Sequence, residues 1–571
     1  MPILKATIAV IMSTFIFACN SSTNTQQQAD LILTNGLIYT VEKDQPWVDA
    51  VAIKDGKFIH VGKQQHIDSY RGKHTEVIDL KGKMVLPGFV ESHAHPLMGG
   101  AYINTLSLDT FSNPEIWVQQ ISDYAQENPD LEVIFGYGFL ASAFGPEGAT
   151  AKQIDSVVND RPVFIMDEGF HGGWANSRAM EMLGINRDTQ DPLPGFSYYK
   201  RDSNGNPTGY FLENTASDAV NALGVINKES LTTGLIDVLK VMNGYGITTV
   251  FDAGAMEVDG LQVAVLNNIY DKGKFSVRMV ASHFIGDESG LKTAVPKTIE
   301  KKNSTKHPMY HINTLKIMID GTIEGRTAGM FEDYQGEPDN QGEIVFTQQQ
   351  LTDLVSHATA ANLDIHIHAL GEKAIHQALN AIEAAKKSSP ESQTRHAICH
   401  VQVIKDEDIQ RFYDLGVIAQ STPLWASFDD YGKQFVSDDQ FNRYFRFNSL
   451  KKAGVKLAFG SDFPATGAGA LGISPIYNIE IGHTRQWAGE KDAPIQPNIE
   501  ERLDIETLIK GYTIDGAYQL HMEDEIGSIK VGKMADLVVL DTNIFKVAPH
   551  EINQIKVIRT ILGGKTVYQK K

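Results

Sequence analysis

Short apolar runs that end in a polar residue recur through the middle of the chain. Eight such runs are Val85–Glu91, Ile247–Asp252, Ser276–Ser282, Thr314–Asp320, Asp364–His368, Ala397–His400, Val417–Ser421 and Lys456–Asp462. From the second run onward, each connection is long enough to hold a helix, such as the one expected over Leu351–Asn362. Eight strands in this rhythm predict an α/β fold, the (β/α)8 TIM barrel, whose active site lies at the C-terminal ends of the strands.

Both ends of the chain instead carry short β segments separated by glycine-containing turns. Neither end has enough strands to bury both faces of a sheet. We therefore predict that residues 30–83 and 523–571 form one small composite β-sandwich domain beside a barrel of residues 84–522. Residues 97–246, which separate the first two runs, hold a strand of their own and are expected to form an insertion that acts as a lid or substrate-binding subdomain.

The first residues predict export from the cytoplasm. Lys5 is followed by the uncharged stretch Ala6–Phe17, which has the length of a signal-peptide core and is too short to span a bilayer. The signal peptide, residues 1–19, ends in Ile16-Phe17-Ala18-Cys19, which resembles a bacterial lipobox with Cys19 as the lipidated residue. The polar residues 20–29 predict a flexible tether. We expect a lipoprotein in the cell envelope of a Gram-negative bacterium, periplasmic or anchored to the outer membrane, with a secreted protein cleaved nearby as the alternative.

Net charge and cysteine content limit the possible partners and cross-links of the chain. The 571 residues are 42% hydrophobic and 21% charged, as in ordinary globular proteins. The formal net charge of −19 argues against a nucleic-acid partner, because phosphate binding needs a basic surface. Apart from Cys19, the only cysteine is Cys399, so the mature chain cannot form an intramolecular disulfide; Cys399 lies in an apolar run and is predicted to be buried packing.

Titratable residues stand at the ends of several predicted strands. Side chains alternate along a strand, so His93 and His95 point to one face, and Lys316 and His368 are predicted to point into the barrel. An inward lysine is costly unless something balances its charge. Histidine nitrogens and carboxylates are common metal ligands. The candidate ligands from strands one, four, five, six and eight are His93, His95, Lys316, His368, His400 and Asp462.

The motifs around these residues resemble the amidohydrolase superfamily of metal-dependent hydrolases, and specifically its YtcJ-like branch, amidohydrolase family 3, which includes N-substituted formamide deformylase. The resemblance covers nearly everything after residue 29. The motifs that carry it are Leu86-Pro-Gly-Phe-Val-Glu-Ser-His-Ala-His-Pro, His171-Gly-Gly-Trp-Ala-Asn-Ser, Leu315-Lys-Ile-Met-Ile-Asp-Gly, Ile367-His-Ala-Leu-Gly-Glu-Lys-Ala, Cys399-His-Val-Gln, Gly460-Ser-Asp-Phe-Pro and Gly532-Lys-Met-Ala-Asp-Leu-Val-Val-Leu.

The resemblance implies a site with two divalent metal ions. In members with two metals, the lysine of strand four is carboxylated and bridges the ions, which would make Lys316 an anionic ligand. One ion would take His368 and His400, and the other His93, His95 and Asp462. The resemblance further implies that metal-bound hydroxide attacks the substrate while Asp462 acts as general acid and base. Zinc suits these ligands, although iron, manganese and cobalt do too.

Several roles stay open at this stage. His396 competes with His400 for the end of its strand. Some superfamily members use one metal and lack the modified lysine, so carboxylation of Lys316 stays open. His366 is expected to support a ligand or to pack in the core rather than to be a ligand. His171, in a family motif, is a candidate for contact with substrate or with the metal-bound water. Glu372 stands where much of the family has aspartate. Ordinary packing or a surface ion pair is expected, with lining of the pocket as the alternative, for Trp174, Arg326 and Trp425.

The predicted function is hydrolysis of a non-peptide C–N bond, in an amide or N-acyl compound of small size, with Asp462, His400 and His171 as catalytic residues. One alternative is a single-metal aminohydrolase that deaminates a heterocycle, which Lys316 argues against. Another is a non-catalytic binding lipoprotein on the same fold, although such relatives usually lose metal ligands. The sequence does not identify the substrate, and it leaves a homo-oligomer open.

Overall fold

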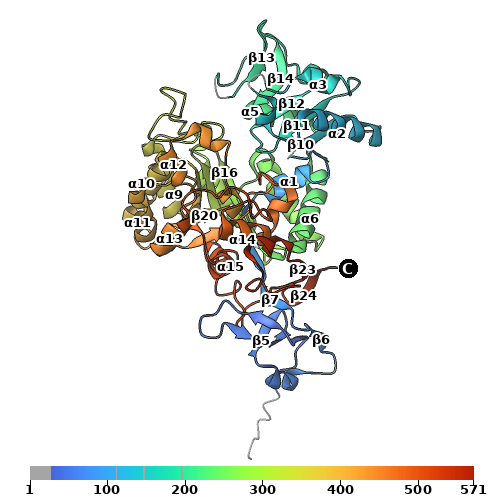
Figure 1. The fold of residues 1–571 in the computed structure, drawn as a ribbon, viewed down its shortest axis with the longest axis vertical. Helices are drawn as coiled ribbons and strands as arrows, with labels where there is room; N and C mark the ends of the chain where they lie inside the picture. The colour runs from blue at the N-terminus through green and yellow to red at the C-terminus, as the bar shows by residue number, and fades with distance from the viewer. Residues whose placement is uncertain (1–26, 111, 146–147, 195–196, 306) are drawn as a thin grey trace, which may run out of the picture.

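A parallel barrel occupies the centre of the molecule (Figure 1). The computed structural model describes residues 27–110, 112–145, 148–194, 197–305 and 307–571. Within these residues, eight strands pair in the order β21-β20-β19-β18-β17-β16-β15-β8, each parallel to its neighbour. Their bounds are β8 (Phe89–Ala94), β15 (Ile247–Asp252), β16 (Arg278–Ile285), β17 (Tyr310–Met318), β18 (Asp364–Ala369), β19 (His396–His400), β20 (Ile418–Ser421) and β21 (Leu457–Phe459).

The last and first strands meet just beyond their ends. The Asp462 N–H donates to the carbonyl of His93 at 2.8 Å, and the His95 N–H donates to the carbonyl of Phe463 at 2.6 Å. These two bonds nearly close the barrel at the face where the strands end. The predicted (β/α)8 fold class is confirmed.

The first predicted run requires a correction, because Val85–Glu91 belongs to two strands. β7 (Met84–Pro87) lies in the domain built from the chain ends, and β8 starts the barrel at Phe89. Between them, Gly88 donates its N–H to the carbonyl of Asp536, and a side chain on it would collide with Thr248. Every residue of both strands is buried, so the apolar pattern alone shows no boundary.

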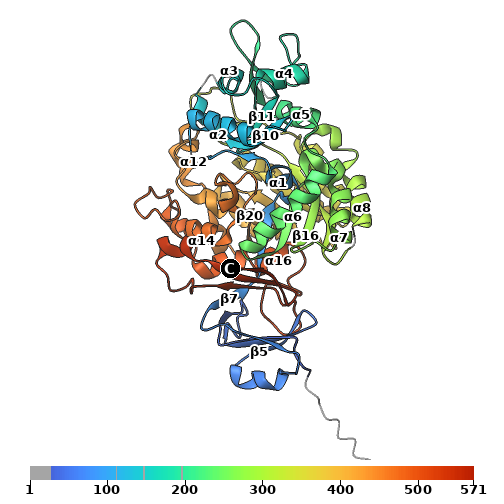
Figure 2. The ribbon, with the colours of Figure 1, turned by 90° about the vertical axis from the view of Figure 1, so that its right-hand side faces the viewer.

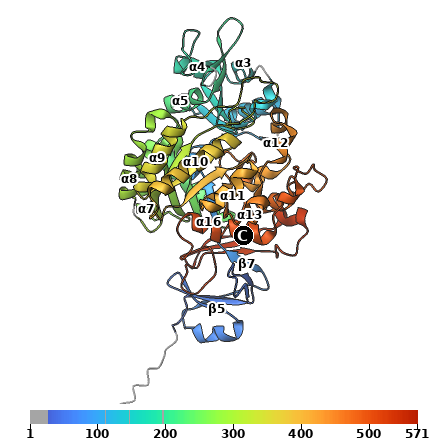
Figure 3. The same ribbon diagram turned by 90° about the vertical axis from the view of Figure 1, so that its left-hand side faces the viewer.

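Helices cover the outside of the barrel (Figure 3). In α10 the buried residues Ala374, Ala378, Ile382 and Ala385 recur every three or four positions, which places one apolar stripe against the strands. Thr347 caps α9 through a reciprocal hydrogen-bond pair with Gln350. The helices that follow the strands include α6 (Lys228–Gly244), α7 (Gln262–Asp271), α8 (Ala294–Ser304), α9 (Gln348–Ala360), α10 (Glu372–Ser388), α11 (Asp406–Asp414), α13 (Phe447–Lys452) and α16 (Ile514–Gln519).

The insertion after β8 has its own sheet, at the top of Figures 1 and 2. Its strands, in the order in which they pair, are β13 (Tyr199–Arg201), β14 (Pro207–Leu212), β12 (Gly172–Ala175), β11 (Val163–Asp167), β10 (Ile134–Phe139) and β9 (Leu106–Ser107). At the two ends of the insertion, α1 (Pro96–Tyr102) and α6 pack on each other. They approach so closely that a side chain on Gly234 would overlap the backbone of Gly100.

Both chain ends form the domain at the bottom of Figure 1. β22 (Leu537–Leu540) pairs antiparallel with β7, which joins the C-terminal strands to the N-terminal ones. Leu33, Val85, Val539 and Ile561 share the core between its two sheets. The described strands are β1 (Leu31–Thr34), β4 (Ala50–Lys54), β5 (Lys57–Gly62) and β6 (Glu76–Asp79) in one sheet, with β2 (Leu37–Tyr39), β3 (Trp47–Val48), β7, β22, β23 (Val557–Leu562) and β24 (Lys565–Gln569) in the other.

The predicted signal peptide, Cys19 and most of the tether lie in residues 1–26, outside the described residues, so the lipoprotein stays a prediction. Among the residues that are described, no helix is both long and apolar enough to cross a bilayer.

A buried ion pair joins the barrel to the end domain. Arg278 on β16 contacts Asp536, and both side chains are almost fully buried. Asp536→Ala leaves the guanidinium buried without its partner, and we expect the free energy of unfolding to fall by about 3–5 kcal/mol in urea denaturation. The control is Lys387→Ala, which removes an exposed ion pair with Glu383 and should leave stability nearly unchanged. Equal small losses in both variants would contradict a structural role for the buried pair.

Candidate metal centre

The candidate ligands lie together at the end of the barrel from which the insertion departs. His93 is on β8 and His95 directly follows it, while Asp462 lies three residues beyond the last residue of β21. Lys316, His368 and His400 come from β17, β18 and β19. All six residues are buried except His368, which is partly exposed.

His93, His95 and Asp462 form the tightest group. The Nε2 atoms of His93 and His95 lie 3.1 and 3.2 Å from Oδ1 of Asp462. The other ring nitrogen of His95, Nδ1, is 2.8 Å from the carbonyl of Gly254 and must donate to it, because a carbonyl only accepts. In its neutral form, His95 would then present the lone pair of Nε2 to a carboxylate. Only a cation between them, a proton or a metal, satisfies both atoms.

Asp462 is placed to remain ionised. Burial raises its pKa, but contact with His95 lowers it, and the pKa is held below its ordinary value. A buried carboxylate with several imidazoles around it is a donor set that suits a divalent ion.

His368 and His400 form a second group beside the first. Their ring centroids are 4.5 Å apart, and the His400 centroid is 4.9 Å from that of His93. Nε2 of His368 and Nδ1 of His400 are buried without a hydrogen-bond partner in the described structure. Burial lowers the pKa of His368 to about 3 and that of His400 well below its usual range. Both rings are thus neutral, the form that binds metals.

The backbone at two candidate ligands adopts the left-handed region. His400 has φ of 72° and Asp462 has φ of 56°. This conformation costs non-glycine residues on the order of 1–3 kcal/mol each and persists where the surroundings enforce it. At both residues it turns the chain at a strand end.

Lys316 lies among the histidines without a carboxylate partner. It pairs in register with His366 on the neighbouring strand, and its Nζ donates to Sγ of Cys399 at 3.1 Å. Within the described part of the chain, no carboxylate oxygen lies within ion-pair distance of Nζ. Sulfur is a weak acceptor, so a bare ammonium is poorly compensated here.

The insertion contributes His171 to the same region. Its Nδ1 is 2.9 Å from Oε2 of Glu213, and its backbone N–H donates to Asp167 at 2.9 Å. The charges of Glu213, Asp167 and Asp462 raise the pKa of His171 to about 9 against the opposing effect of burial. The ring is therefore an imidazolium at neutral pH, with an exposed fraction of 38% for its side chain.

The structure also locates three further residues of strands β18 and β19. His396 starts β19 at the far end of the barrel and contacts the hydroxyls of Thr359 and Thr394, whereas His400 ends the strand. Cys399 is fully buried, and burial raises the pKa of its thiol to about 12. His366 contacts His93 directly, with Nε2 2.9 Å from Nδ1 of His93.

The three residues considered for lining the pocket have different surroundings, as does Glu372. The ring of Trp425 lies 5.4 Å from that of His400, so this side chain borders the site. Trp174 is buried in the core of the insertion and donates to the carbonyl of Thr150. Arg326 is exposed and pairs with Glu337, and Glu372 is buried against Arg443.

Sequence reasoning missed two acidic residues of the insertion. Glu213 precedes α5 (Asn214–Leu223), far from the His171 motif, and no local pattern links the two. Glu168 accepts the N–H of Gly467 in the loop after Asp462, and burial raises its pKa to about 8. Its place beside a glycine-rich segment was the available signal. The Glu168–Gly467 contact ties the insertion to the mouth of the barrel, whereas the His171–Glu213 pair lies within the insertion.

A parallel barrel whose strand ends gather histidines around a carboxylate defines the class of metal-dependent hydrolase barrels. The chain belongs to the amidohydrolase family, whose model matches residues 76–568. The superfamily resemblance drawn from the motifs is confirmed.

Individual relatives cover most of the chain. The exoenzymes regulatory protein AepA of Pectobacterium carotovorum subsp. carotovorum is 30% identical, over 75% of this chain and 93% of its own length. N-substituted formamide deformylase of Arthrobacter pascens is 25% identical, over 95% and 99%. The crystal structure of an uncharacterized metal-dependent hydrolase from Pyrococcus horikoshii OT3 superposes with a TM-score of 0.71 at 23% identity, covering 91% of this chain and 99% of that one. Family membership and the His and Asp groups support a metal-dependent hydrolase with a divalent ion.

Proposed function

We propose that the chain hydrolyses a non-peptide C–N bond in a small amide or N-acyl compound. The observation that carries the proposal is Nε2 of His95 held 3.2 Å from the Asp462 carboxylate, with His93 beside them and Nδ1 of His95 directed to the carbonyl of Gly254. Such a trio requires a cation, and the family is one of hydrolases. The relative named for N-substituted formamide deformylation supports an amide-type bond.

The residues present fit two divalent ions, with zinc as the proposed metal. His93, His95 and Asp462 would hold one ion, and His368 and His400 the other, whose unpartnered nitrogens are available as ligands. Lys316 would join them as a carbamate, formed when its amine adds carbon dioxide, because an anion suits this position better than a bare ammonium. When bound, the metal activates water and polarises the scissile carbonyl.

The side chains of the protein would carry the proton transfers. The Asp462 carboxylate accepts a proton from the attacking water and later delivers it to the leaving nitrogen, so that the amine departs neutral. The His171 imidazolium, oriented by Glu213, would donate a hydrogen bond to oxygen of the substrate carbonyl as negative charge develops there. Trp425 would border the bound substrate beside His400.

Elemental analysis combined with a substrate screen tests the proposal. Purified protein is expected to hold about two divalent ions per chain and to release amine from some N-formyl, N-acyl or cyclic amides. The matched variant is His93→Ala, which should lose both metal and turnover. A metal-free, inert wild-type protein would contradict the proposal, and the metal found decides among zinc, iron, manganese and cobalt.

The His171–Glu213 pair predicts an alkaline limit to activity. Because the pKa of His171 is raised to about 9, the charged ring is present at neutral pH and is lost as pH rises through about 9, when kcat/KM should fall. The stability that the pair gives to the folded protein depends on pH in the same direction. It is complete below the ordinary pKa of histidine and is lost as pH rises through about 9. Glu213→Gln removes the largest cause of the raised pKa of His171 and should move the alkaline limit of activity to lower pH. His171→Asn should abolish this limit. Superimposable pH profiles for wild type and Glu213→Gln would refute the pairing.

A further inference from the structure

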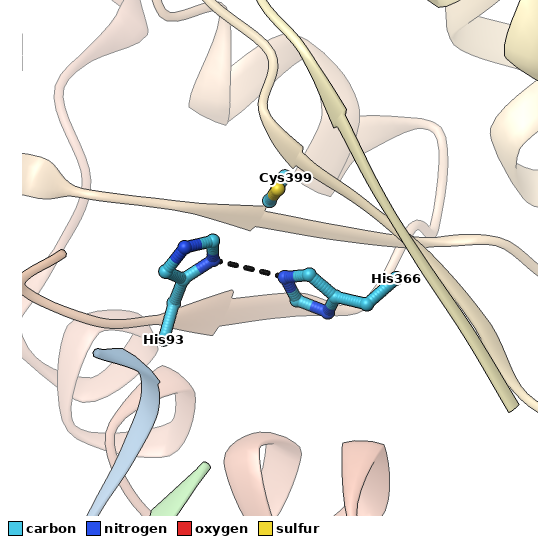
Figure 4. Close-up of side chains that lie close together, drawn as sticks. All are labelled: His93, His366 and Cys399. Carbon is cyan, nitrogen blue, oxygen red and sulfur yellow. Dashed lines mark hydrogen bonds between the residues drawn. The ribbon is translucent and has the colours of Figure 1, made fainter. Parts of the chain in front are cut away.

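A second histidine lies beneath the candidate ligands, inside the barrel. Nδ1 of His93 is 2.9 Å from Nε2 of His366, a hydrogen-bond distance, and both rings are almost fully buried (Figure 4). His366 is two residues before His368 on β18, so the same face of one strand places one histidine at the mouth and the other below it.

This contact determines which nitrogen of His93 is available. One ring must supply the hydrogen and the other the lone pair. If His93 donates from Nδ1, its Nε2 keeps the lone pair and can bind a metal. In the reverse arrangement Nε2 would carry a hydrogen, yet its contact with Asp462 at 3.1 Å lacks the geometry of a hydrogen bond. The first arrangement therefore fits better, and it matches His95, whose Nδ1 must donate to Gly254.

The surroundings hold His366 rigidly for this role. Its ring lies against Phe251 at a centroid distance of 4.8 Å, and strand pairs fix its backbone between Lys316 and Ala397. A buried acceptor in the middle of a strand can orient a neighbouring ring at little entropic cost, because packing already restricts its own freedom.

An alternative is that a thiophilic metal ion binds between His93, His366 and Cys399. Their ligand atoms lie within 4.8 Å of one another. However, the two nitrogens are already at hydrogen-bond distance, and Sγ of Cys399 already accepts from Lys316. Direct bonds thus account for all three side chains without an ion.

We propose that His366 is a positioning residue that fixes His93 in the tautomer and orientation that present Nε2 to the metal. The proposal rests on the metal centre of the proposed function and goes further by assigning a role to a residue that is not itself a ligand. It predicts that His366 governs metal affinity although it never touches the metal or the substrate.

The test compares two polar substitutions that differ in reach. Glutamine can place an acceptor where Nε2 of histidine lies, whereas the shorter asparagine cannot. His366→Gln should keep metal affinity within about threefold of wild type, and His366→Asn should weaken it about 10–100-fold, measured by competition with a chromophoric chelator. His396→Asn, at the far end of the barrel, is the matched control and should not change affinity. Circular dichroism verifies the fold of each variant.

Spectroscopy supplies a readout that a purely structural role would not move. In the cobalt-loaded protein, His366→Asn should shift the visible bands of the ion, while His366→Gln should restore the wild-type spectrum. Equal affinities and spectra in the Gln and Asn variants would overturn the proposal. So would an additional equivalent of cadmium that is lost in Cys399→Ser, because it would show an ion between these side chains. If wild type binds no metal, or His93→Ala binds it normally, the proposed function itself fails.

Discussion

Replacing Asp462 with asparagine is expected to lower kcat by about 10²–10⁴-fold while leaving much of the metal bound. The substitution keeps the size of the side chain and an oxygen at the position that faces His93 and His95. It removes the ability to accept a proton from water, since an amide is not a base at neutral pH. The loss should therefore appear in kcat with metal-saturated enzyme and should not be recovered by adding metal.

Asp408→Asn is the matched control for this variant. Asp408 is also buried and contacts His376 and Arg411, but it lies on α11, outside the barrel strands. This change should lower the stability of the protein and leave kcat unchanged. If the metal-loaded Asp462→Asn protein kept kcat within about threefold of wild type, the acid–base role of Asp462 would be wrong.

The sequence predicted the barrel well because its strands are short apolar runs with one face toward helices and one toward the centre. The prediction failed at Gly88, where two fully buried strands follow each other along the chain. Only the contacts of Gly88 with Asp536 and Thr248 mark the boundary between these strands. Such a boundary depends on residues more than 150 positions away in the chain, which local patterns cannot report.

The candidate site likewise contains residues that the sequence predicts and residues that it does not. The ligands could be named because each stands at the end of a predicted strand, and barrel topology brings strand ends together. Their partners could not be named: Glu213 orients His171, Cys399 accepts from Lys316, and Gly254 fixes the tautomer of His95. None of these pairs is close in sequence, and a backbone carbonyl has no sequence signature at all. Local pattern thus gives the donor set, and only the structure gives the tautomers and charges that decide how it can act.

Lys316 offers the sharpest test of how many ions the site holds. Among the described residues, the amine of Lys316 has only a sulfur acceptor. Its burial is therefore either an uncompensated energetic cost or a sign that the residue is the precursor of a carbamate ligand. Lys316→Ala is expected to reduce the metal content from about two ions to one per chain and to lower kcat by about 10²–10³-fold, because charge stabilisation in the transition state is lost. Lys316→Glu restores a carboxylate, although on a shorter side chain, and should recover part of the metal content.

Carbon dioxide provides an independent readout for the same residue. Reconstitution of metal-free wild type with labelled ¹³C-bicarbonate should give a carbamate carbonyl resonance that is missing in Lys316→Ala and present in Cys399→Ala, where only the sulfur contact is removed. Rigorous exclusion of bicarbonate should lower metal loading of wild type and leave Lys316→Ala unaffected. If Lys316→Ala instead bound as much metal as wild type and kept its kcat, Lys316 would not be a metal ligand. The lysine would then be a buried cation that keeps neighbouring histidines neutral, because its charge lowers the pKa values of His93 and His368 in addition to the effect of burial.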